Sequence, residues 1–488
     1  MKGKIFFSGL ILSFLALSFV KAQNIQFEDA NFKAKLLSAS PDNEIAKDVN
    51  GNSVAIDTNG DREISQAEAL NIYYLDISKT QDIKSIKGIE YFTNLFMLDC
   101  HDLYLLKSLD VSKNINLKGL NLRNTGIQTL DISKNIDLEL LVLGYTGIQT
   151  LDVSKNINLQ GLNLSSIEIK VLDISKNINL QWMNLDSTGI QTLDISKNIN
   201  LQKLYLDNTG IKTLDISKNI NLQSLSLNST KVETLDLSKN ISLQELNLGS
   251  TEIKTLDVLK NINLQELFLD DTGIKTIDIS KNINLQGLDL SSTGIQTLDV
   301  SKNVNLQQLK LSSTGIKALD VSKNINLQGL GLDSTKIETL DLSKNINLQI
   351  LNLSSTGIET LDISVNINLQ KLDLTNTKIK TLNLSKNINL QEMYLSNIEM
   401  KTLDLSHNIK LTDLYLRNCT GLTFLYMKNG VKKTFNRYSN VFYGYDFRGT
   451  NSLNYICCDE DEIADVKDYM GNRDNLTITS DCETGGTK

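Results

Sequence analysis

The residues with the clearest capacity for chemistry lie in one short segment near the N-terminus. Between Asp57 and Glu68, oxygen-bearing side chains recur at alternate positions, as in calcium loops of the form D-x-[DN]-x-[DN]-G-x5-E. Oxygen ligands at this spacing can surround one hard cation. The candidate ligands are Asp57, Asn59, Asp61, Glu63 through its backbone carbonyl, and Glu68.

The segment departs from the pattern at its sixth position, where Arg62 replaces the glycine that normally supplies the sharp turn. Gly60 lies two residues earlier and can compensate in part for the missing glycine. The sequence therefore predicts a structural Ca²⁺ site in this segment. The alternative is a polar turn without metal, in which the same side chains bond to nearby backbone groups.

Catalytic chemistry has few candidates elsewhere. The 488 residues include only two histidines, His101 and His407, so a three-histidine metal site is excluded. No nucleophile–base pair and no glycine-rich phosphate loop occurs. The net charge of −8 argues against nucleic acid as a partner, because phosphate binding needs a basic surface. We expect a protein that is not an enzyme.

The five cysteines divide into two groups. Cys457, Cys458 and Cys482 cluster near the C-terminus, where a disulfide from either Cys457 or Cys458 to Cys482 is expected. Sequence alone does not choose between the two pairings. Cys100 and Cys419 lie within repeated segments, and we expect them to be free, buried and apolar in character.

The first 22 residues have the features of a secretory signal peptide. Lys2 and Lys4 precede an apolar stretch from residue 5 to 20, and a small-residue cleavage pattern ends at Ala22. The apolar stretch is shorter than the roughly 20 residues of a membrane-spanning helix. No second long apolar stretch follows, so we expect export without a transmembrane span. Export also permits disulfide formation.

Between the two ends, a strict sequence repeat determines where each residue lies in the fold. A Leu-Asp pair begins at Leu109 and its equivalent recurs every 21 residues to Leu403, which makes 15 positions without insertion or deletion. A period of this length is typical of a solenoid whose repeats pack on their neighbours. In the unit Leu117 to Asp137, apolar residues stand at 117, 120, 122, 127, 130, 132 and 136. We expect all seven in the core, on two strand-like half-repeats.

The pattern L-x-x-L-x-L-x-x-N/T-x-L/I resembles the leucine-rich repeat, over residues 86–424. The phrase LDISKNINL resembles 21-residue bimodular repeats of exported, internalin-like proteins from Bacteroidetes-type bacteria. The resemblance implies a right-handed solenoid with parallel strands and little helix. Because both halves of the unit look like strands, we expect two sheets on opposite sides and hence a weakly curved solenoid.

The chain then divides into four parts. These are a signal peptide (1–22), an N-terminal cap with the calcium loop (23–85), the solenoid (86–424) and a C-terminal cap (425–488), which we expect a disulfide to tie. Caps are needed because the ends of a solenoid otherwise expose apolar edges.

Three columns of equivalent residues are nearly constant. Asp follows the repeated Leu at 14 of 15 positions, and Lys usually stands three residues later. We expect these charges to form a solvated, nearly neutral ladder, with a cation-binding stripe as the alternative. The Asn column, from Asn114 to Asn408, is complete. We expect its side chains to bond to the backbone of neighbouring turns.

Another exposed column, which begins at Asn121, varies from repeat to repeat. Variation on an exposed strand face fits recognition, with aromatic side chains as anchors. The candidates are Tyr205, Phe268, Tyr394 and Tyr415 in this column and Trp182 at a flanking position that also varies. We expect a secreted or cell-surface protein that binds a protein ligand, or alternatively a glycan, in adhesion or as a scaffold. The competing hypothesis is a structural spacer or matrix protein.

Overall fold

The computed structural model describes residues 23–80, 82–435, 444–471 and 473–482. The predicted signal peptide, residues 1–22, lies outside these ranges. Among the described residues, no helix has the length and the apolar character that crossing a membrane requires.

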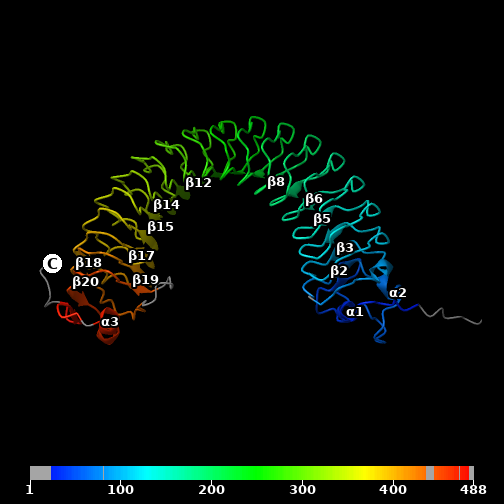
Figure 1. The fold of residues 1–488 in the computed structure, drawn as a ribbon, viewed down its shortest axis with the longest axis horizontal. Coiled ribbons are helices and arrows are strands. Elements are labelled where there is room, and N and C mark those ends of the chain that lie inside the picture. The colour runs from blue at the N-terminus through cyan, green and yellow to red at the C-terminus, as the bar shows by residue number, and fades with distance from the viewer. Residues whose placement is uncertain (1–22, 81, 436–443, 472, 483–488) are drawn as a thin grey trace, which may run out of the picture.

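The described chain coils into an open arch (Figure 1), with short strands along its inner side and turns along its outer side. Nineteen strands form one sheet. Only β1 is antiparallel to its neighbour, and the others follow in parallel. The strands of this sheet are β1 (Ala46–Lys47), β2 (Tyr74–Asp76), β3 (Met97–Asp99), β4 (Gly119–Asn121), β5 (Leu140–Val142), β6 (Gly161–Asn163), β7 (Trp182–Asn184), β8 (Lys203–Tyr205), β9 (Ser224–Ser226), β10 (Glu245–Asn247), β11 (Glu266–Phe268), β12 (Gly287–Asp289), β13 (Gln308–Lys310), β14 (Gly329–Gly331), β15 (Ile350–Asn352), β16 (Lys371–Asp373), β17 (Glu392–Tyr394), β19 (Asp413–Tyr415) and β21 (Tyr445–Asp446).

The 21-residue period sets the register of this sheet. Leu246 of β10 lies opposite Leu267 of β11, and the same relation recurs in turn after turn. The middle residue of each of these strands is buried, while its two neighbours face the inside of the arch. Strands of three residues bury little by themselves, so stacking on both neighbours stabilises each turn.

Short helices and a second, small sheet complete the two ends. At the N-terminal end, α1 (Ala30–Leu37) is capped by Asp29, and α2 (Gln66–Ala69) begins with a capping box between Ser65 and Glu68. The N-terminal end also contains the 3-10 turn η1 (Ile89–Tyr91). At the C-terminal end, the second sheet contains β18 (Thr402–Asp404), β20 (Phe424–Tyr426), β22 (Tyr455–Cys457) and β23 (Thr477–Thr479), with η2 (Glu460–Glu462) and α3 (Ile463–Met470) beside it.

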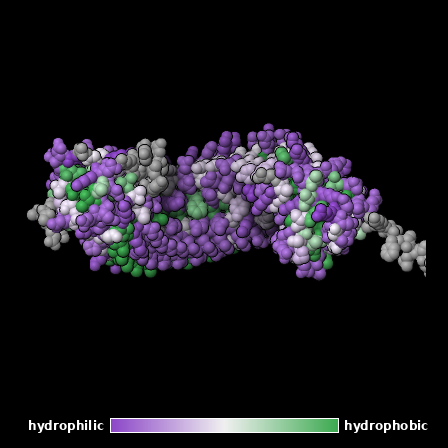
Figure 2. Space-filling view, turned by 90° about the horizontal axis from the view of Figure 1, so that it is seen from below, coloured by the Kyte–Doolittle hydropathy of each residue, from purple (hydrophilic) through white to green (hydrophobic). Residues whose placement is uncertain are grey.

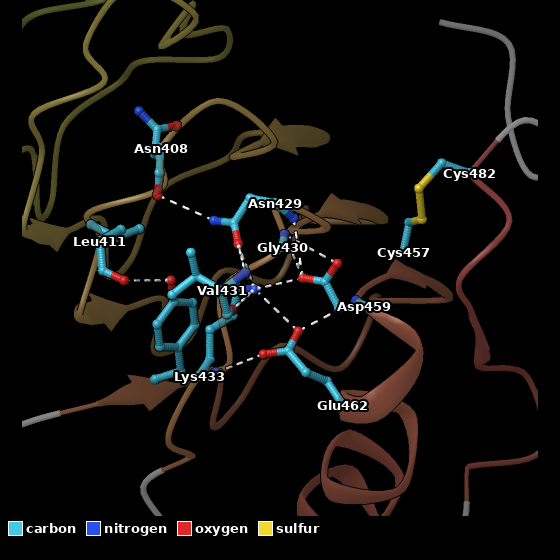
Figure 3. A network of polar contacts seen from close by, with 11 residues as sticks. Asn408, Leu411, Asn429, Gly430, Val431, Lys433, Cys457, Asp459, Glu462 and Cys482 are labelled. Carbon is cyan, nitrogen blue, oxygen red and sulfur yellow. Dashed lines mark hydrogen bonds and ion pairs between the residues drawn. A yellow bond between two sulfur atoms is a disulfide. The ribbon is translucent and has the colours of Figure 1, made fainter.

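A buried polar network holds the C-terminal end together (Figure 3). The Nζ of Lys433 lies 2.9 Å from Asn429 Oδ1, 3.3 Å from Asp459 Oδ2 and 3.1 Å from Glu462 Oε2. The side chains of Lys433 and Glu462 are 1% and 0% exposed. Cys457 is bonded to Cys482, and Cys458 is a buried free thiol, as are Cys100 and Cys419.

The expectation of two sheets on opposite sides is wrong for most of the solenoid. In the described chain, the second half-repeat forms a strand only at β18, which pairs with β20. The bond from a backbone amide to the Asp side chain two residues earlier, as from Ser133 to Asp131 at 2.9 Å, is also present at β18, where Asp404 accepts from Ser406. In the units without a strand, the carbonyl that follows the Asp, for example that of Ile132, accepts instead from the Asn side chain of the next turn, Asn156.

The weak curvature that was expected from two opposed sheets is not observed either, since Figure 1 shows a pronounced arch. Strands that share a ladder lie about 4.8 Å apart. The outer side is built from turns and has no such constraint, so it spreads further than the inner side. A sheet on one side only therefore bends the solenoid.

One of the seven columns expected in the core is exposed. Ile136 is 54% exposed, and its equivalents behave in the same way. The Leu130 column is partly buried against the core, whereas positions such as Leu120 and Ile127 are fully buried. Ile136 follows the buried Asn135 within a turn, and the turn directs the isoleucine side chain outward.

The prediction for the Asn column is confirmed. Asn135 Nδ2 donates to the carbonyl oxygens of Val111 at 3.0 Å and Asn114 at 2.8 Å, both in the preceding turn. The same pair of bonds recurs along the column to Asn408. Each of these asparagines is 0% exposed. The column therefore joins successive turns where the chain returns toward the strands.

Candidate functional site

Near its C-terminal end, the inner face of the sheet carries a compact group of aromatic and charged side chains. The rings of Tyr394 and Tyr415, on adjacent strands, stack with centroids 4.9 Å apart and planes 4° from parallel. Lys371 Nζ lies 5.1 Å from the Tyr394 centroid and 2.7 Å from Glu392 Oε2. Glu392 Oε2 also accepts a hydrogen bond from Tyr394 Oη at 3.0 Å.

The two tyrosines differ in exposure, and Tyr415 was predicted to be more exposed than it is. Tyr415 is only 6% exposed, and its Oη has no hydrogen-bond partner among the described residues. Tyr394 is half-buried. Burial and the bond to Glu392 raise the pKa of Tyr394 far above its usual range, so its hydroxyl stays protonated. Tyr415 thus supports the ring of Tyr394 from beside it.

Two arginines and a buried aspartate, which were not predicted from the sequence, extend this group of side chains. The Arg417 guanidinium lies 5.8 Å from the Tyr415 ring centroid and donates through Nε to Asp446 Oδ2 at 2.5 Å. Arg448 also donates to Asp446, which is 0% exposed. Asp446 lies outside the 21-residue period, and pairing of β19 with β21 brings it to the site. The only sequence signal was an acidic residue within an aromatic-rich segment.

Burial alone would raise the pKa of Asp446. The hydrogen bonds from Arg448 and Arg417 outweigh burial and lower the pKa to about 2. Asp446 is therefore ionised at neutral pH and fixes the Arg417 guanidinium beside the Tyr415 ring. We name the group Lys371, Glu392, Tyr394, Tyr415 and Arg417 the tyrosine cluster.

The other predicted anchors are separate from the tyrosine cluster. Trp182, half-buried on β7, lies across Gly161 of β6, where a side chain would meet the indole. Tyr205 is on the next strand and is near Ser224, at 3.5 Å between hydroxyl oxygens. Among the described residues no ring contact joins Trp182 and Tyr205. Phe268 is half-buried on β11. The structure therefore brings together only the Tyr394–Tyr415 pair.

The predicted calcium loop adopts a compact turn that its own backbone stabilises. Asp57 accepts hydrogen bonds from the Gly60 and Arg62 amides at 2.7 and 2.9 Å. Asn59 and Asp61 each accept from the amide two residues later. Arg62 has φ 63°, so it takes the left-handed conformation that glycine adopts in such loops. The turn therefore forms without a glycine at its sixth position.

The ligand set itself is less well arranged for a metal. Both oxygens of Glu68 are engaged, Oε1 by the amide and hydroxyl of Thr58 and Oε2 by those of Ser65. Glu63 pairs with Lys33 at 2.7 Å. Across the described residues, no three His, Cys, Asp or Glu side chains group in a way that can hold a metal ion. Calcium binding by the loop stays a prediction.

Two further surface features are the column of Asp side chains and a groove lined by amide side chains. The exposed Asp side chains accept hydrogen bonds from Ser backbone groups, and these bonds lower the pKa of Asp131 and its equivalents, with nearby Lys charge a smaller cause. A shallow groove lies on another side, lined by the amides of successive turns, such as Gln160, Asn179 and Gln181. Figure 2 shows that the surface seen from below is mostly hydrophilic.

The parallel inner sheet, the 21-residue register and the Asn column define a leucine-rich repeat solenoid. No family model matches the sequence, and no curated protein does so either. Solved structures with the same fold include bacterial internalin-like proteins. The functional domain of InlJ from Listeria monocytogenes is 27% identical, with a TM-score of 0.59, over 72% of this chain and 72% of that chain.

Two other solved structures extend the comparison of the fold. A leucine-rich repeat protein of Leptospira interrogans is 22% identical, with a TM-score of 0.62, over 85% of this chain and 97% of that chain. The ectodomain of the plant receptor kinase GASSHO1/SCHENGEN3 from Arabidopsis thaliana, in complex with CASPARIAN STRIP INTEGRITY FACTOR 2, is 18% identical. Its TM-score is 0.60, over 81% of this chain and 54% of that chain.

Proposed function

We propose that this protein is a secreted or cell-surface recognition protein, without catalytic activity, that binds a protein ligand through the tyrosine cluster. The observation that carries the proposal is the stacked Tyr394–Tyr415 pair, flanked by Lys371, Glu392 and Arg417. Aromatic and arginine side chains held rigid by their neighbours are the groups that dominate binding energy at protein interfaces. The plant receptor ectodomain found among the similar folds is in complex with CASPARIAN STRIP INTEGRITY FACTOR 2, which supports a binding role for this fold.

The charges of the tyrosine cluster favour a protein over a glycan. Lys371 and Arg417 supply positive charge, while Glu392 and the nearby Asp413 supply negative charge. Both signs within one small area suit a peptide surface that carries both. A glycan remains the alternative ligand.

The test is a binding screen against secreted and surface proteins, with a glycan array in parallel. The probes are the chain without residues 1–22 and its Tyr394→Ala variant. Tyr145→Ala is the matched control, because Tyr145 is a 54% exposed tyrosine in a turn and off the sheet face. We expect a protein ligand whose affinity falls at least tenfold in Tyr394→Ala and stays unchanged in Tyr145→Ala. A ligand that binds all three proteins equally would contradict the proposal.

The spacer hypothesis rests on a different observation, the near-identity of successive turns along the solenoid. A spacer needs length and stiffness but no anchor residues. If the screen returns no protein and no glycan ligand, the spacer hypothesis is favoured over recognition. Capture of further copies of the same chain does not decide between the two, because it would involve another surface.

A further inference from the structure

A continuous row of exposed isoleucines follows the solenoid from end to end. Each member stands directly after a buried asparagine of the Asn column and is 44–55% exposed. We name this set the isoleucine row. Its members are Ile115, Ile136, Ile157, Ile178, Ile199, Ile220, Ile241, Ile262, Ile283, Val304, Ile325, Ile346, Ile367, Ile388 and Ile409.

The composition of the row differs from that of the variable exposed columns. Its only change is Ile to Val, at Val304, whereas position 128 and its equivalents change among Gln, Lys and Glu. An exposed β-branched apolar side chain makes no hydrogen bond to water, and a long exposed apolar stripe is unusual on a monomer. The row therefore has the character of a surface that another molecule covers.

The neighbours of the row on the strand side are uncharged amides. The column that follows it is Asn at 12 of 15 positions, and the next exposed column is Gln at 12 of 15 positions. Asn263 Nδ2 donates to the carbonyl of Ile241 at 3.0 Å, and this contact recurs along the column. The row and the two amide columns lie on the part of each turn through which the chain returns to the strands.

We propose that this surface binds a second copy of the same chain, in an antiparallel and twofold-symmetric arrangement. A fully buried isoleucine removes on the order of 100 Å² of apolar surface from water, so fifteen half-exposed side chains offer about 750 Å². Stable interfaces bury about 800 Å² on each partner. The row thus supplies nearly the whole apolar area of a stable dimer.

The curvature of the isoleucine row favours a second copy of the chain as the partner. The row follows the arch, so a straight partner would leave it after a few turns. Rotation by 180° about an axis that points to the centre of the arch places a second arch directly over the first, with the chain direction reversed. Ile262, the eighth of fifteen members, then meets Ile262 of the other copy, and Ile136 meets Ile388.

The charges along the amide columns fit the same arrangement. Asn and Gln each donate and accept, so an amide column can bond to its own copy. Four members of these columns are charged, and the antiparallel pairing places a neutral residue opposite each. The pairs are Lys118 with Thr412, Asp137 with Asn389, Glu139 with Gln391, and Lys410 with Asn116.

The first test measures the mass of the assembly by sedimentation equilibrium, for the chain without residues 1–22. We expect a dimer. A variant with Ile220→Ser, Ile241→Ser, Ile262→Ser and Ile283→Ser should weaken the dimer at least a hundredfold, while its circular dichroism stays that of the parent. The matched control changes Thr213, Thr234, Thr255 and Thr276, exposed residues of the same turns, to Ser. It should remain dimeric.

The second test uses single variants that keep the rest of the row. Ile262→Cys should form a disulfide-linked dimer on mild oxidation. Ile136→Cys and Ile388→Cys should cross-link when mixed, and neither should do so alone. A parent chain that is monomeric at 100 times the concentration used for binding would overturn the proposal, as would a dimer that the four serine substitutions leave intact. Binding of neutral lipid vesicles by the parent monomer would assign the row to a membrane surface and equally overturn it.

Discussion

At the scale of single residues, the Asn column shows how one side chain joins two turns. The Nδ2 of Asn261 donates to the carbonyls of Leu237 at 3.2 Å and Asn240 at 2.8 Å, both in the preceding turn. Its Oδ1 is buried without a partner, as in every member of the column. Desolvation of that oxygen offsets part of the gain from the two donated bonds.

Replacement of Asn261 by Ala should therefore destabilise the protein by about 2 kcal/mol, because two buried carbonyls each lose one of their two donors while one orphaned oxygen disappears with the side chain. Urea unfolding followed by circular dichroism measures the loss. The control is Asn263→Ala, two residues away and exposed, which should change the free energy of unfolding by about 0.5 kcal/mol or less. Equal effects of the two variants would contradict a special role for the column.

The loop from Asp57 to Glu68 gives a second prediction at this scale. If it binds calcium, a hundredfold excess of Ca²⁺ over the dissociation constant should stabilise the protein by about 2.7 kcal/mol. Thermal melting with Ca²⁺ and with a chelator tests this, and Asp57→Ala should abolish the difference. Arg62→Gly should raise the melting temperature both with Ca²⁺ and with chelator, since glycine adopts the conformation at φ 63° without the cost of about 1 kcal/mol that a side chain adds. Identical melting with Ca²⁺ and chelator would contradict the calcium prediction.

At the scale of elements, the buried Lys433 joins the last strands to η2 and α3. It compensates the charge of Glu462, whose side chain is fully buried. Lys433→Ala should cost about 3 kcal/mol, because it leaves that carboxylate without its partner. Lys432→Ala is the control, since Lys432 is 63% exposed and, among the described residues, pairs only with the exposed Asp465. Removal of such a surface pair should cost about 0.5 kcal/mol or less.

The C-terminal elements should also depend on pH through Asp446. Its pKa is lowered to about 2 in the folded protein, against about 3.9 in an unfolded chain. A lowered pKa contributes stability that is present above the unfolded value and is lost as pH falls through the folded value. The difference in stability between the parent and Asp446→Asn should thus shrink as pH falls from about 4 to about 2. Urea midpoints at several pH values measure it, and a constant difference would contradict the assignment.

The elements also show what could be predicted from the sequence. Strands such as β4 follow from the L-x-L alternation, because side chains on a strand point alternately inward and outward. The second half-repeat has a similar alternation, but in most units it forms no ladder, and the carbonyl of Ile132 or its equivalent bonds to the Asn side chain of the next turn. Side-chain bonds of this kind compete with strand pairing, and the apolar alternation alone does not reveal them.

The site was predicted less well, for a related reason. Tyr394 and Tyr415 follow from the 21-residue register, which places them on adjacent strands. Asp446 follows no register, since the chain between β19 and β21 leaves the repeat. The isoleucine row was expected in the core because Ile136 is apolar, and only the turn geometry shows that it faces outward. Apolar character predicts burial only where the backbone direction is known.

At the scale of the whole molecule, the arch is a stack in which each turn contacts only its two neighbours. Leu246 of β10 pairs with Leu225 on one side and with Leu267 on the other. The equivalent residues of β9 and β11 would meet in the same geometry if the turn between them were absent. The length of the arch is therefore separable from its fold.

Deletion of residues 244–264 removes one complete 21-residue unit and joins Leu243 to Gln265. Because Gln265 is equivalent to Gln244, β11 should pair with β9 and the Asn column should stay continuous. We expect circular dichroism per residue like that of the parent, and a shorter arch in small-angle X-ray scattering. Deletion of residues 244–263 is the matched control. It shifts the register by one residue and turns buried leucines toward solvent, so it should aggregate or unfold. If both deletions fold equally well, the strict register is not what holds the arch together.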